Sequence, residues 1–374
     1  MSSALLARVA LSRVLEPGEP KALALVAELG PEVVLEALHE QAQRPGASEG
    51  LVGRLAGIEP ARDLERAAAL GVRFVTPEDP EWPMALADLA FAGETMQRGQ
   101  IPVGLWVRGV GNLSELCTRA VAIVGSRSCS VAGADTAAQL SFSVAKQGWT
   151  VVSGAAFGID QAAHRGCLAA KHPTVAVLAC GLDRAYPASA APLLDVIAAE
   201  GVVVSESPPG EHPTPIRFLA RNRIIAALGA GTVVVEAAIR SGALNTATWA
   251  DRMSRMLMGV PGPVTSAPST GVHQMIRQRG ALLVTSGEEV LEAISPSGDH
   301  AQGTLWEPAK ARDRLSIAHQ QVLDAVPVVQ AVEAPRLART AGMSLGVVKE
   351  ALAVLEGQGF VVRQGERWRL ADSA

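Results

Sequence analysis

Hydrophobic and polar positions divide the chain into regions with different patterns. The first 70 or so residues show helical spacing in short amphipathic stretches, which Gly and Pro interrupt, as at Pro45-Gly46. From Val72 the pattern changes to short strands and turns, and then to a regular alternation of valine-rich strands and helices. We therefore expect a small helical domain over residues 1–70, followed by an α/β domain over residues 71–295.

The alternation in the second region predicts a doubly wound, mostly parallel, Rossmann-like sheet with helices on both faces. The expected strands are Ala120–Val124, Thr150–Ser153, Thr174–Leu178, Gly201–Ser205, Gly231–Glu236, Met256–Val260 and Ala281–Thr285. Ligands of such sheets bind beyond the carboxyl ends of the strands, so a site is expected in the turns that follow them.

The end of the chain has a pattern of its own. The hydrophilic residues 296–314 predict a linker, and residues 315–374 a third domain. Helices near Ser316–Val326, Ala334–Ala341 and Ser344–Gly357, with a hairpin that turns at Gln364-Gly365, are typical of a winged helix. Its third helix offers only Lys349 against Glu350 and Glu356, which is poor for reading a DNA groove, so we expect protein contact or auxiliary strand binding.

Composition limits the possible functions. With 374 residues, of which 48% are hydrophobic, the chain can build two or three substantial cores. A net charge of −4 argues against coating of DNA by bulk electrostatics, so any nucleic-acid site must be local. The four cysteines show no Cys-x-x-Cys spacing, and no metal or cofactor is expected. Since no signal peptide or membrane-spanning run is recognisable, we expect a cytoplasmic protein.

The turn after the strand Ala120–Val124 is the first candidate site. Gly125, Ser126 and Arg127 lead into a helix there, with Ser130 at its start. Backbone N–H groups and the positive end of the helix dipole would face an anion, and Arg127 adds a planar donor fork. The pattern predicts a phosphate cradle, although a tight turn with an exposed arginine would give the same short motif.

Three further segments should meet this turn at the same edge of the sheet. The second turn contributes Ser153, Gly154 and Phe157, and the fourth segment Ser241, Gly242, Asn245 and Thr246. Small residues let a backbone approach closely, and the hydroxyl and amide groups can donate to phosphate or sugar. N-capping by Ser241 explains much of the fourth pattern without a ligand.

The third segment is the most specific of the four, and it contributes Arg217, Phe218, Arg221, Asn222 and Arg223. It combines cations for a nucleic-acid backbone with a ring on which a base can stack. The alternative is a helix whose Phe218 faces the core, while its arginines are solvated or paired with Glu206 and Glu211.

Catalytic patterns are not recognisable. Glu236 is the only carboxylate well placed among these turns and lacks a second acid, and His164 is expected to be structural. The dipeptide Gly-Lys of a P-loop is absent, and the strand Thr150–Ser153 does not end in the acidic residue that would hold a ribose. We therefore do not expect an enzyme.

The motifs of the α/β domain, taken in order, resemble the DNA-processing protein DprA (Smf) family. The matching segments are Ala122–Arg127, Ser153–Asp160, His164–Gly166, Ala176–Asp183 with Tyr186-Pro187, Ser205-Glu206, Phe218–Ile225, Val235–Ala237, Ser241–Ala247 and Val260–Gly262. The two terminal regions are similar to the sterile-alpha-motif-like and winged-helix domains of many members. The resemblance implies a non-enzymatic single-stranded DNA-binding protein that protects incoming strands in natural transformation and loads the RecA recombinase.

The resemblance also implies roles for individual residues. It puts Gly125, Ser126 and Arg127 on a DNA phosphate, Phe218 against a base, and Arg221 and Arg223 along the backbone. It further implies a homodimer through the later part of the α/β domain, about Met256 to Val284.

Two departures from the family pattern bear on affinity. Many relatives have an arginine where this chain has Phe157, and a basic residue usually precedes the Phe-x-x-Arg-Asn-Arg run, where Thr214-Pro215-Ile216 leave only Arg217. These departures predict weaker DNA binding at each site, unless the Phe157 ring stacks or Arg217 compensates.

Two competing hypotheses remain. The first is a nucleotide-processing, phosphoribohydrolase-like enzyme with a similar sheet, although its Pro-Gly-Gly-x-Gly-Thr turn corresponds here to Gly229–Thr232, without the Pro-Gly-Gly. The second is a dinucleotide-dependent oxidoreductase, which would require saturable NAD binding.

Overall fold

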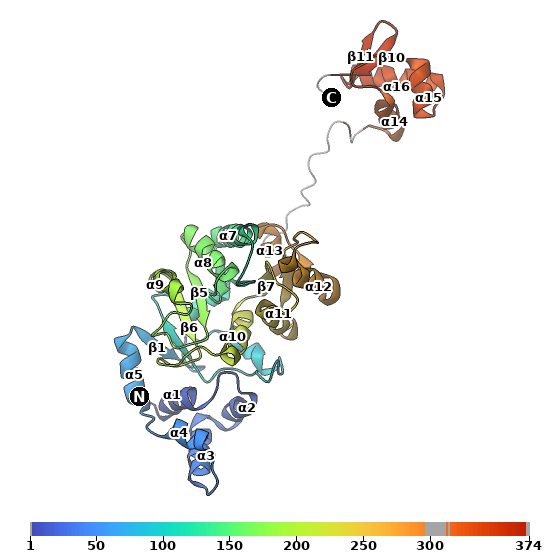
Figure 1. Ribbon diagram of the computed structural model, residues 1–374. Helices are drawn as coiled ribbons and strands as arrows, with labels where there is room; N and C mark the ends of the chain where they lie inside the picture. The colour runs from blue at the N-terminus through green and yellow to red at the C-terminus, as the bar shows by residue number, and fades with distance from the viewer. Residues whose placement is uncertain (1, 296–311, 313–314, 372–374) are drawn as a thin grey trace. The chain divides into compact units, whose positions relative to one another are not determined.

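The computed structural model describes residues 2–295, 312 and 315–371. These residues divide into two units, Met1–Ala301 and Gln302–Ala374 (Figure 1). The linker expected over residues 296–314 lies outside the described residues, apart from Arg312. Among the described helices, none has the length and apolar character needed to cross a membrane.

Five helices open the first unit: α1 (Ser3–Val14), α2 (Pro20–Leu29), α3 (Pro31–Gln43), α4 (Glu49–Leu55) and α5 (Pro60–Ala69). Proline begins α2, α3 and α5, where its missing N–H is not needed. Leu11, Leu23, Val26 and Val34 form a small core with Val103, which belongs to the segment before β2. The helical region expected over residues 1–70 is therefore present, and it belongs to the same unit as the sheet.

A nine-stranded sheet forms the centre of the first unit, in the order β1-β2-β6-β5-β4-β3-β7-β8-β9. The strands are β1 (Val72–Val75), β2 (Leu105–Arg108), β3 (Ala120–Val124), β4 (Thr150–Ser153), β5 (Thr174–Leu178), β6 (Val202–Ser205), β7 (Gly231–Val234), β8 (Met256–Gly259) and β9 (Leu282–Leu283). All pairings among the seven strands from β6 to β9 in the sheet order are parallel. Strand β2 runs antiparallel to both of its neighbours, β1 and β6. The predicted doubly wound α/β fold is confirmed.

Both faces of the sheet are covered, because successive side chains of a strand point to opposite faces. Within β3, Val121 and Ile123 join the core beneath α7 (Val131–Lys146), α8 (Ile159–Ala169) and α13 (Gly287–Ile294). Ala122 and Val124 join the core beneath α10 (Pro215–Leu228), α11 (Gly242–Arg252) and α12 (Thr270–Arg279). The shorter helices are α6 (Leu113–Thr118) and α9 (Ala191–Glu200), with η1 (Met84–Ala90), η2 (Ala188–Ala190) and η3 (Ala267–Ser269).

The strand order reverses at β3. The chain runs from β3 through β4 and β5 to β6 on one side, and then crosses back to β7 on the other. Ligands of doubly wound sheets bind at such a reversal, beyond the carboxyl ends of the strands. The topology therefore predicts a ligand site in the turns that follow β3, β4 and β7.

The second unit has the winged-helix arrangement that the sequence predicts. Helices α14 (Ile317–Ala325), α15 (Ala334–Ala341) and α16 (Leu345–Gly357) pack on the antiparallel sheet β10-β12-β11, whose strands are Val332–Glu333, Arg367–Leu370 and Val361–Gln364. Val322, Leu337, Leu352 and Trp368 lie in its core.

His164 anchors α8 to the sheet. Its ring is fully buried, and Nδ1 lies 2.8 Å from the hydroxyl of Thr174, which itself donates to the Val151 carbonyl at 2.6 Å. The hydroxyl proton is thus already used, so this network assigns the N–H to Nδ1 of the ring. Burial lowers the pKa of His164 to about 3, and the charge of Arg221 adds to this effect. The histidine is structural and neutral, as the sequence suggested.

This burial predicts an acid-sensitive fold. The pKa of His164 in the folded chain lies below its ordinary value of 6.5, so its contribution is complete above pH 6.5 and is lost as the pH falls toward 3. Below pH 6.5 the free energy of unfolding of the wild type should therefore fall up to about 1.4 kcal/mol per pH unit more steeply than that of His164→Gln. Urea unfolding at a series of pH values measures the difference. His39→Gln, which alters an exposed histidine of α3, should keep the wild-type slope, and parallel profiles for His164→Gln and the wild type would contradict the assignment.

Candidate nucleic-acid interface

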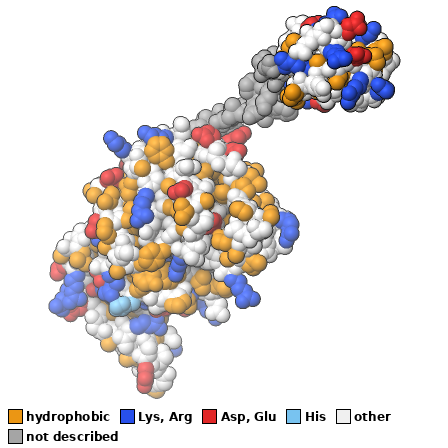
Figure 2. Space-filling model, turned by 45° about the horizontal axis from the view of Figure 1, so that its top comes forward, with side chains coloured by type: hydrophobic (Ala, Val, Ile, Leu, Met, Phe, Trp, Pro, Cys, Tyr) orange, Lys and Arg blue, Asp and Glu red, His pale blue; other side chains and the backbone are white. Residues whose placement is uncertain are grey.

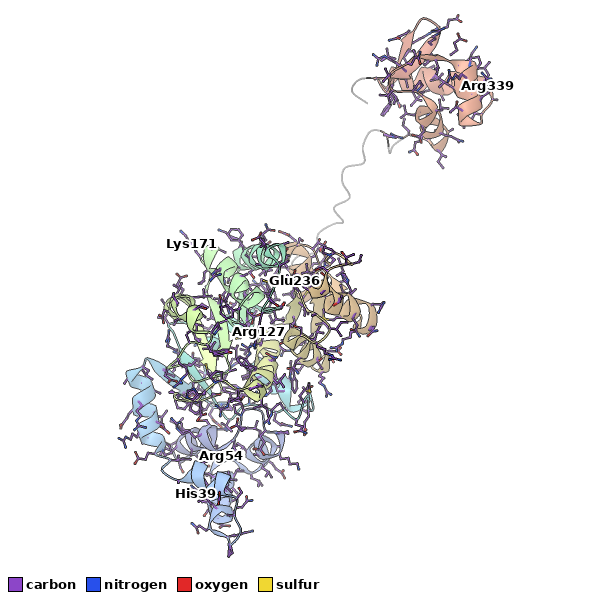
Figure 3. The ribbon with its side chains drawn as sticks, viewed as in Figure 1. His39, Arg54, Arg127, Lys171, Glu236 and Arg339 are labelled. Carbon is purple, nitrogen blue, oxygen red and sulfur yellow. The ribbon has the colours of Figure 1, made fainter. Side chains whose placement is uncertain are left out.

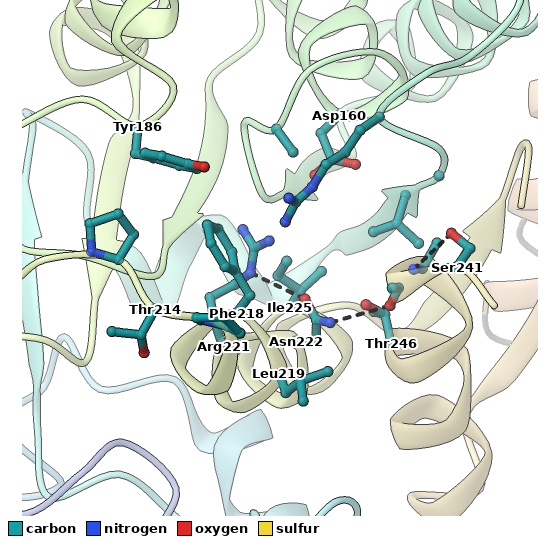
Figure 4. Close-up of a pocket in the computed structure, with 18 residues that line it drawn as sticks. Asp160, Tyr186, Thr214, Phe218, Leu219, Arg221, Asn222, Ile225, Ser241 and Thr246 are labelled. Carbon is teal, nitrogen blue, oxygen red and sulfur yellow. Dashed lines mark hydrogen bonds between the residues drawn. The ribbon is translucent and has the colours of Figure 1, made fainter.

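A pocket of about 600 Å³ lies at the carboxyl edge of the sheet (Figure 4). Its wall comes from the segments after β3, β4, β5, β6 and β7 and from one face of α10. Eight of the sixteen residues expected to bind DNA line it: Gly125, Arg127, Phe218, Arg221, Asn222, Ser241, Gly242 and Thr246. The segments that the sequence singled out do meet here.

Two helices point their amino ends into this pocket. The start of α10 contributes Thr214 and Pro215, and the start of α11 contributes Ser241, Gly242 and Ala243. Thr214 and Ser241 are the N-caps, and their hydroxyls accept hydrogen bonds from the amides of Arg217 and Ala243, each at 3.3 Å. The positive ends of both helix dipoles therefore face the pocket.

Two of the chain's own carboxylates bind backbone amides next to the pocket, Glu236 at the start of α7 and Asp160 in the turns after β3 and β4. Glu236 accepts hydrogen bonds from the amide of Ser130 at 2.9 Å and from its hydroxyl at 2.5 Å, and its carbonyl accepts from the Ser126 amide at 2.7 Å. Asp160 accepts from the amides of Gly125, Gly154 and Ala156, while burial raises its pKa. The amides of Gly125, Ser126 and Ser130 are therefore already bonded within the protein, whereas the Arg127 side chain lines the pocket.

Arg127 retains a free guanidinium in this turn. It is exposed and lies over the ring of Phe218, 4.5 Å from its centroid, and no carboxylate in the described part of the chain pairs with it. Tyr186 stands beside Phe218 with ring centroids 5.4 Å apart. Tyr186 was not among the predicted site residues, although it is the only tyrosine of the chain and follows β5 at the edge where ligands bind.

Arg221 forms part of the pocket floor. Its side chain is buried and donates to the carbonyls of Gly154 at 2.9 Å and Val177 at 2.5 Å, and to the side chain of Asn222 at 3.2 Å. A Cβ at Gly154 would overlap this guanidinium, which explains the glycine there. Burial lowers the pKa of Arg221 to about 10, opposed by Asp160, so the group keeps its charge at neutral pH.

Arg223 does not reach the pocket. It is completely buried, pairs with both oxygens of Glu206 at 2.7 Å, and donates to the carbonyls of Gly99 and Gln100 at 3.1 and 2.9 Å. The expected position of Arg223 along a DNA backbone is therefore wrong, because α10 turns this residue away from the face that carries Phe218 and Asn222.

Arg217 is also engaged within the protein. Its guanidinium pairs with Glu16 at 3.1 Å and with Glu211 at 2.6 Å, and it donates to the carbonyl of His212. The pairing of Arg223 with Glu206 and that of Arg217 with Glu211 agree with the alternative in which the arginines of this helix bind the protein's own carboxylates. That interpretation fails for Phe218, which faces the pocket and not the core.

The remaining predicted residues lie outside the pocket lining. The hydroxyl of Ser153 is buried and donates to the Ile123 carbonyl at 2.6 Å, and Oδ1 of Asn245 accepts from Nδ2 of Asn222 at 3.2 Å. Phe157 is 49% exposed in the turn after β4. Ser126, Ser130 and Gly154 support the turns as described above.

Charge is distributed sparsely around the site. Cationic side chains are scattered over the face of the first unit in Figure 2 and form no broad patch. Arg127 and Glu236 occupy the same central part of this unit (Figure 3). The described residues contain no cluster of His, Cys, Asp and Glu that could hold a metal ion. The pocket lining contains two cations, Arg127 and Arg221, and one carboxylate, Asp160.

Comparison with known proteins identifies similar chains. A family model described as DNA recombination-mediator protein A matches residues 73–295. A DNA processing protein DprA of Mycobacterium tuberculosis is 41% identical over 369 residues, which is 96% of this chain and 92% of the relative.

Two solved structures are also similar. The X-ray structure of DNA processing protein A from Streptococcus pneumoniae shares 30% identity at a TM-score of 0.63, covering 79% of this chain and 99% of that one. A Helicobacter pylori structure, titled for its unique single-stranded DNA binding mode, shares 25% identity at a TM-score of 0.51, covering 59% of this chain and 94% of that one.

The burial of Arg223 predicts a role in stability. Arg223→Met leaves Glu206 buried without its partner, which should reduce the free energy of unfolding by about 3–5 kcal/mol. Denaturant unfolding followed by circular dichroism measures this loss. Arg62→Met, which removes an exposed arginine of α5 that pairs with Glu59, should leave the midpoint unchanged. Equal midpoints for both variants would show that the buried pair does not hold these segments together.

Proposed function

Because the chain belongs to the DNA recombination-mediator protein A family, we propose that it binds single-stranded DNA in the pocket at the carboxyl edge of its sheet. The observation that carries the proposal is the combination of Arg127, two open helix ends and the ring pair Phe218–Tyr186 around one cavity. The cations and helix ends hold phosphate, and the rings offer faces on which unpaired bases stack.

This chemistry favours an unpaired strand over a duplex. Bases inside a duplex are already stacked on each other, so their faces are not available to Phe218 and Tyr186. Every base has a face for stacking, and phosphates carry no sequence information, so binding is tolerant of sequence. In the proposal, Gly125, Ser241, Gly242, Asn222 and Thr246 shape the cavity around the strand, and Phe157 extends it at the rim.

The proposal extends to the biological role. The protein protects incoming strands in natural transformation and loads RecA onto them in the cytoplasm, without catalysis. It acts as a homodimer through the region Met256 to Val284. The edge strand β9 supports the proposed dimer. Its residues Leu282 and Leu283 are nearly half exposed, and β9 is the last strand of the sheet, so a strand of a second copy could pair with it.

The enzymatic alternative gains no support from the site. Glu236, the one acid considered for it, is 8% exposed and is bound to the amide and the hydroxyl of Ser130. Its carboxylate thus holds the turn before α7 in place.

Removal of the Arg127 charge tests the anion site. Arg127→Ala should lower the affinity for a fluorescent oligothymidine at least tenfold at low salt, and should reduce the slope of log affinity against log salt by about 0.7 if one phosphate contact is lost. Fluorescence anisotropy at a series of salt concentrations measures both. Arg44→Ala removes an exposed arginine at the end of α3, outside the pocket and the proposed dimer region, and serves as the matched control. Equal affinities of Arg127→Ala and the control would refute the site.

Replacement of the ring tests stacking separately from charge. Phe218→Leu should cost about 1–3 kcal/mol of binding, whereas Phe218→Tyr keeps a stacking face and most of the affinity. Because no charge is altered, the salt slope should stay at its wild-type value in both variants. The same anisotropy titrations decide the point, and a loss as large for Phe218→Tyr as for Phe218→Leu would argue against base stacking.

A further inference from the structure

The start of α7 is built around Glu236. This carboxylate comes from the segment after β7 and reaches the helix through Ser130, whose amide and hydroxyl both donate to it. Gly133, in the first turn of α7, has no side chain, and a Cβ at that position would overlap the carboxylate. The Ser126 amide donates to the carbonyl of Glu236, which fixes the two turns together. The helix is thus shaped to accept this one side chain.

The same place is a common phosphate site in folds of this type. The helix follows β3, where the strand order reverses, and its 16 residues give a full dipole at the amino end. Nucleotides and dinucleotides bind doubly wound sheets largely through phosphates at such a helix start. A carboxylate supplies the same negative charge and accepting oxygens, so it substitutes for a phosphate. A second anion would meet like charge, occupied space and a Ser130 amide that is already bonded.

We infer that Glu236 is a selectivity residue, which excludes the phosphates of free nucleotides from the start of α7. The openings at α10 and α11 are left for the ligand. This role of Glu236 rests on the proposed function. Without the carboxylate, free nucleotides and inorganic phosphate would compete with the polynucleotide for the site.

The experiment uses inorganic phosphate as the probe. Backbone amide shifts of Ser130 and Gly133 are followed by NMR in the full chain, with phosphate titrated against chloride of equal ionic strength. The wild type is expected to show no saturable shift up to 20 mM. Glu236→Ala is expected to show saturable binding at least tenfold tighter than any in the wild type, with a phosphate-dependent rise in Tm.

Glu289→Ala is the matched control. This carboxylate also closes a helix start, since it accepts from the amide and hydroxyl of Thr285 before α13, but its helix is short and lies away from the strand reversal. It should gain no phosphate binding. Equal gains in both variants would overturn the inference, because they would mean that any uncapped helix suffices. Saturable binding by the wild type at Ser130 and Gly133, or no gain in Glu236→Ala, would overturn it as well.

Two further readouts keep the test decisive. If Glu236→Ala is unfolded in chloride, phosphate but not chloride should restore its circular dichroism, and failure to restore it counts against the inference. Oligothymidine binding by the wild type is measured in parallel. Its absence would refute the proposed function while the phosphate result on Glu236 stands by itself.

Discussion

Four helices begin at one edge of the sheet, and the positive ends of their dipoles govern the electrostatics of the site. The parallel topology imposes this, because α7, α8, α10 and α11 all start where strands end. Concentrated positive potential must be neutralised or used. The chain neutralises it at α7 with Glu236, whereas the starts of α10 and α11 line the pocket. The proposed anion site is thus local, in a protein with a net charge of −4.

Helix α10 divides its arginines between structure and site. Arg221 is on the pocket side, while Arg223 joins Glu206 to the carbonyls of Gly99 and Gln100 on the opposite side. Arg217 binds Glu16, in the turn between α1 and α2, and thus ties the helical region to the pocket wall. One short cluster of cations therefore connects three separate parts of the chain and contributes a single charge to the cavity.

The fold could be predicted from the sequence because buried parallel strands leave a local signal. Val121, Val151 and Val175 lie in runs that are apolar on both faces, and each run is confined to a few residues between turns. The turns of the site were predictable for the same reason, since they follow the strand ends. The outer strand β9 proved shorter than expected, because only Leu282 and Leu283 pair with β8.

The sequence could not show which hydrogen-bond donors of the site already have a partner within the protein. Ser130 and Glu236 are 106 positions apart, and only the folded chain brings the carboxylate to the amide. The arginines of α10 carry equal charges in the sequence, but their partners Glu16, Glu206 and Gly99 come from distant segments. Helical spacing could have shown that Arg223 lies off the face of α10 that Phe218 and Asn222 share.

The stacking of Arg127 on Phe218 has a consequence for how a ligand would enter. The guanidinium rests on the aromatic face that an incoming base needs, so the arrangement without ligand is closed to stacking. In the proposed complex, a base that stacks on this face displaces the cation, which becomes available to a phosphate. Entry in the proposed complex is therefore an exchange of partners, and the lost cation–ring contact lowers the net gain from stacking.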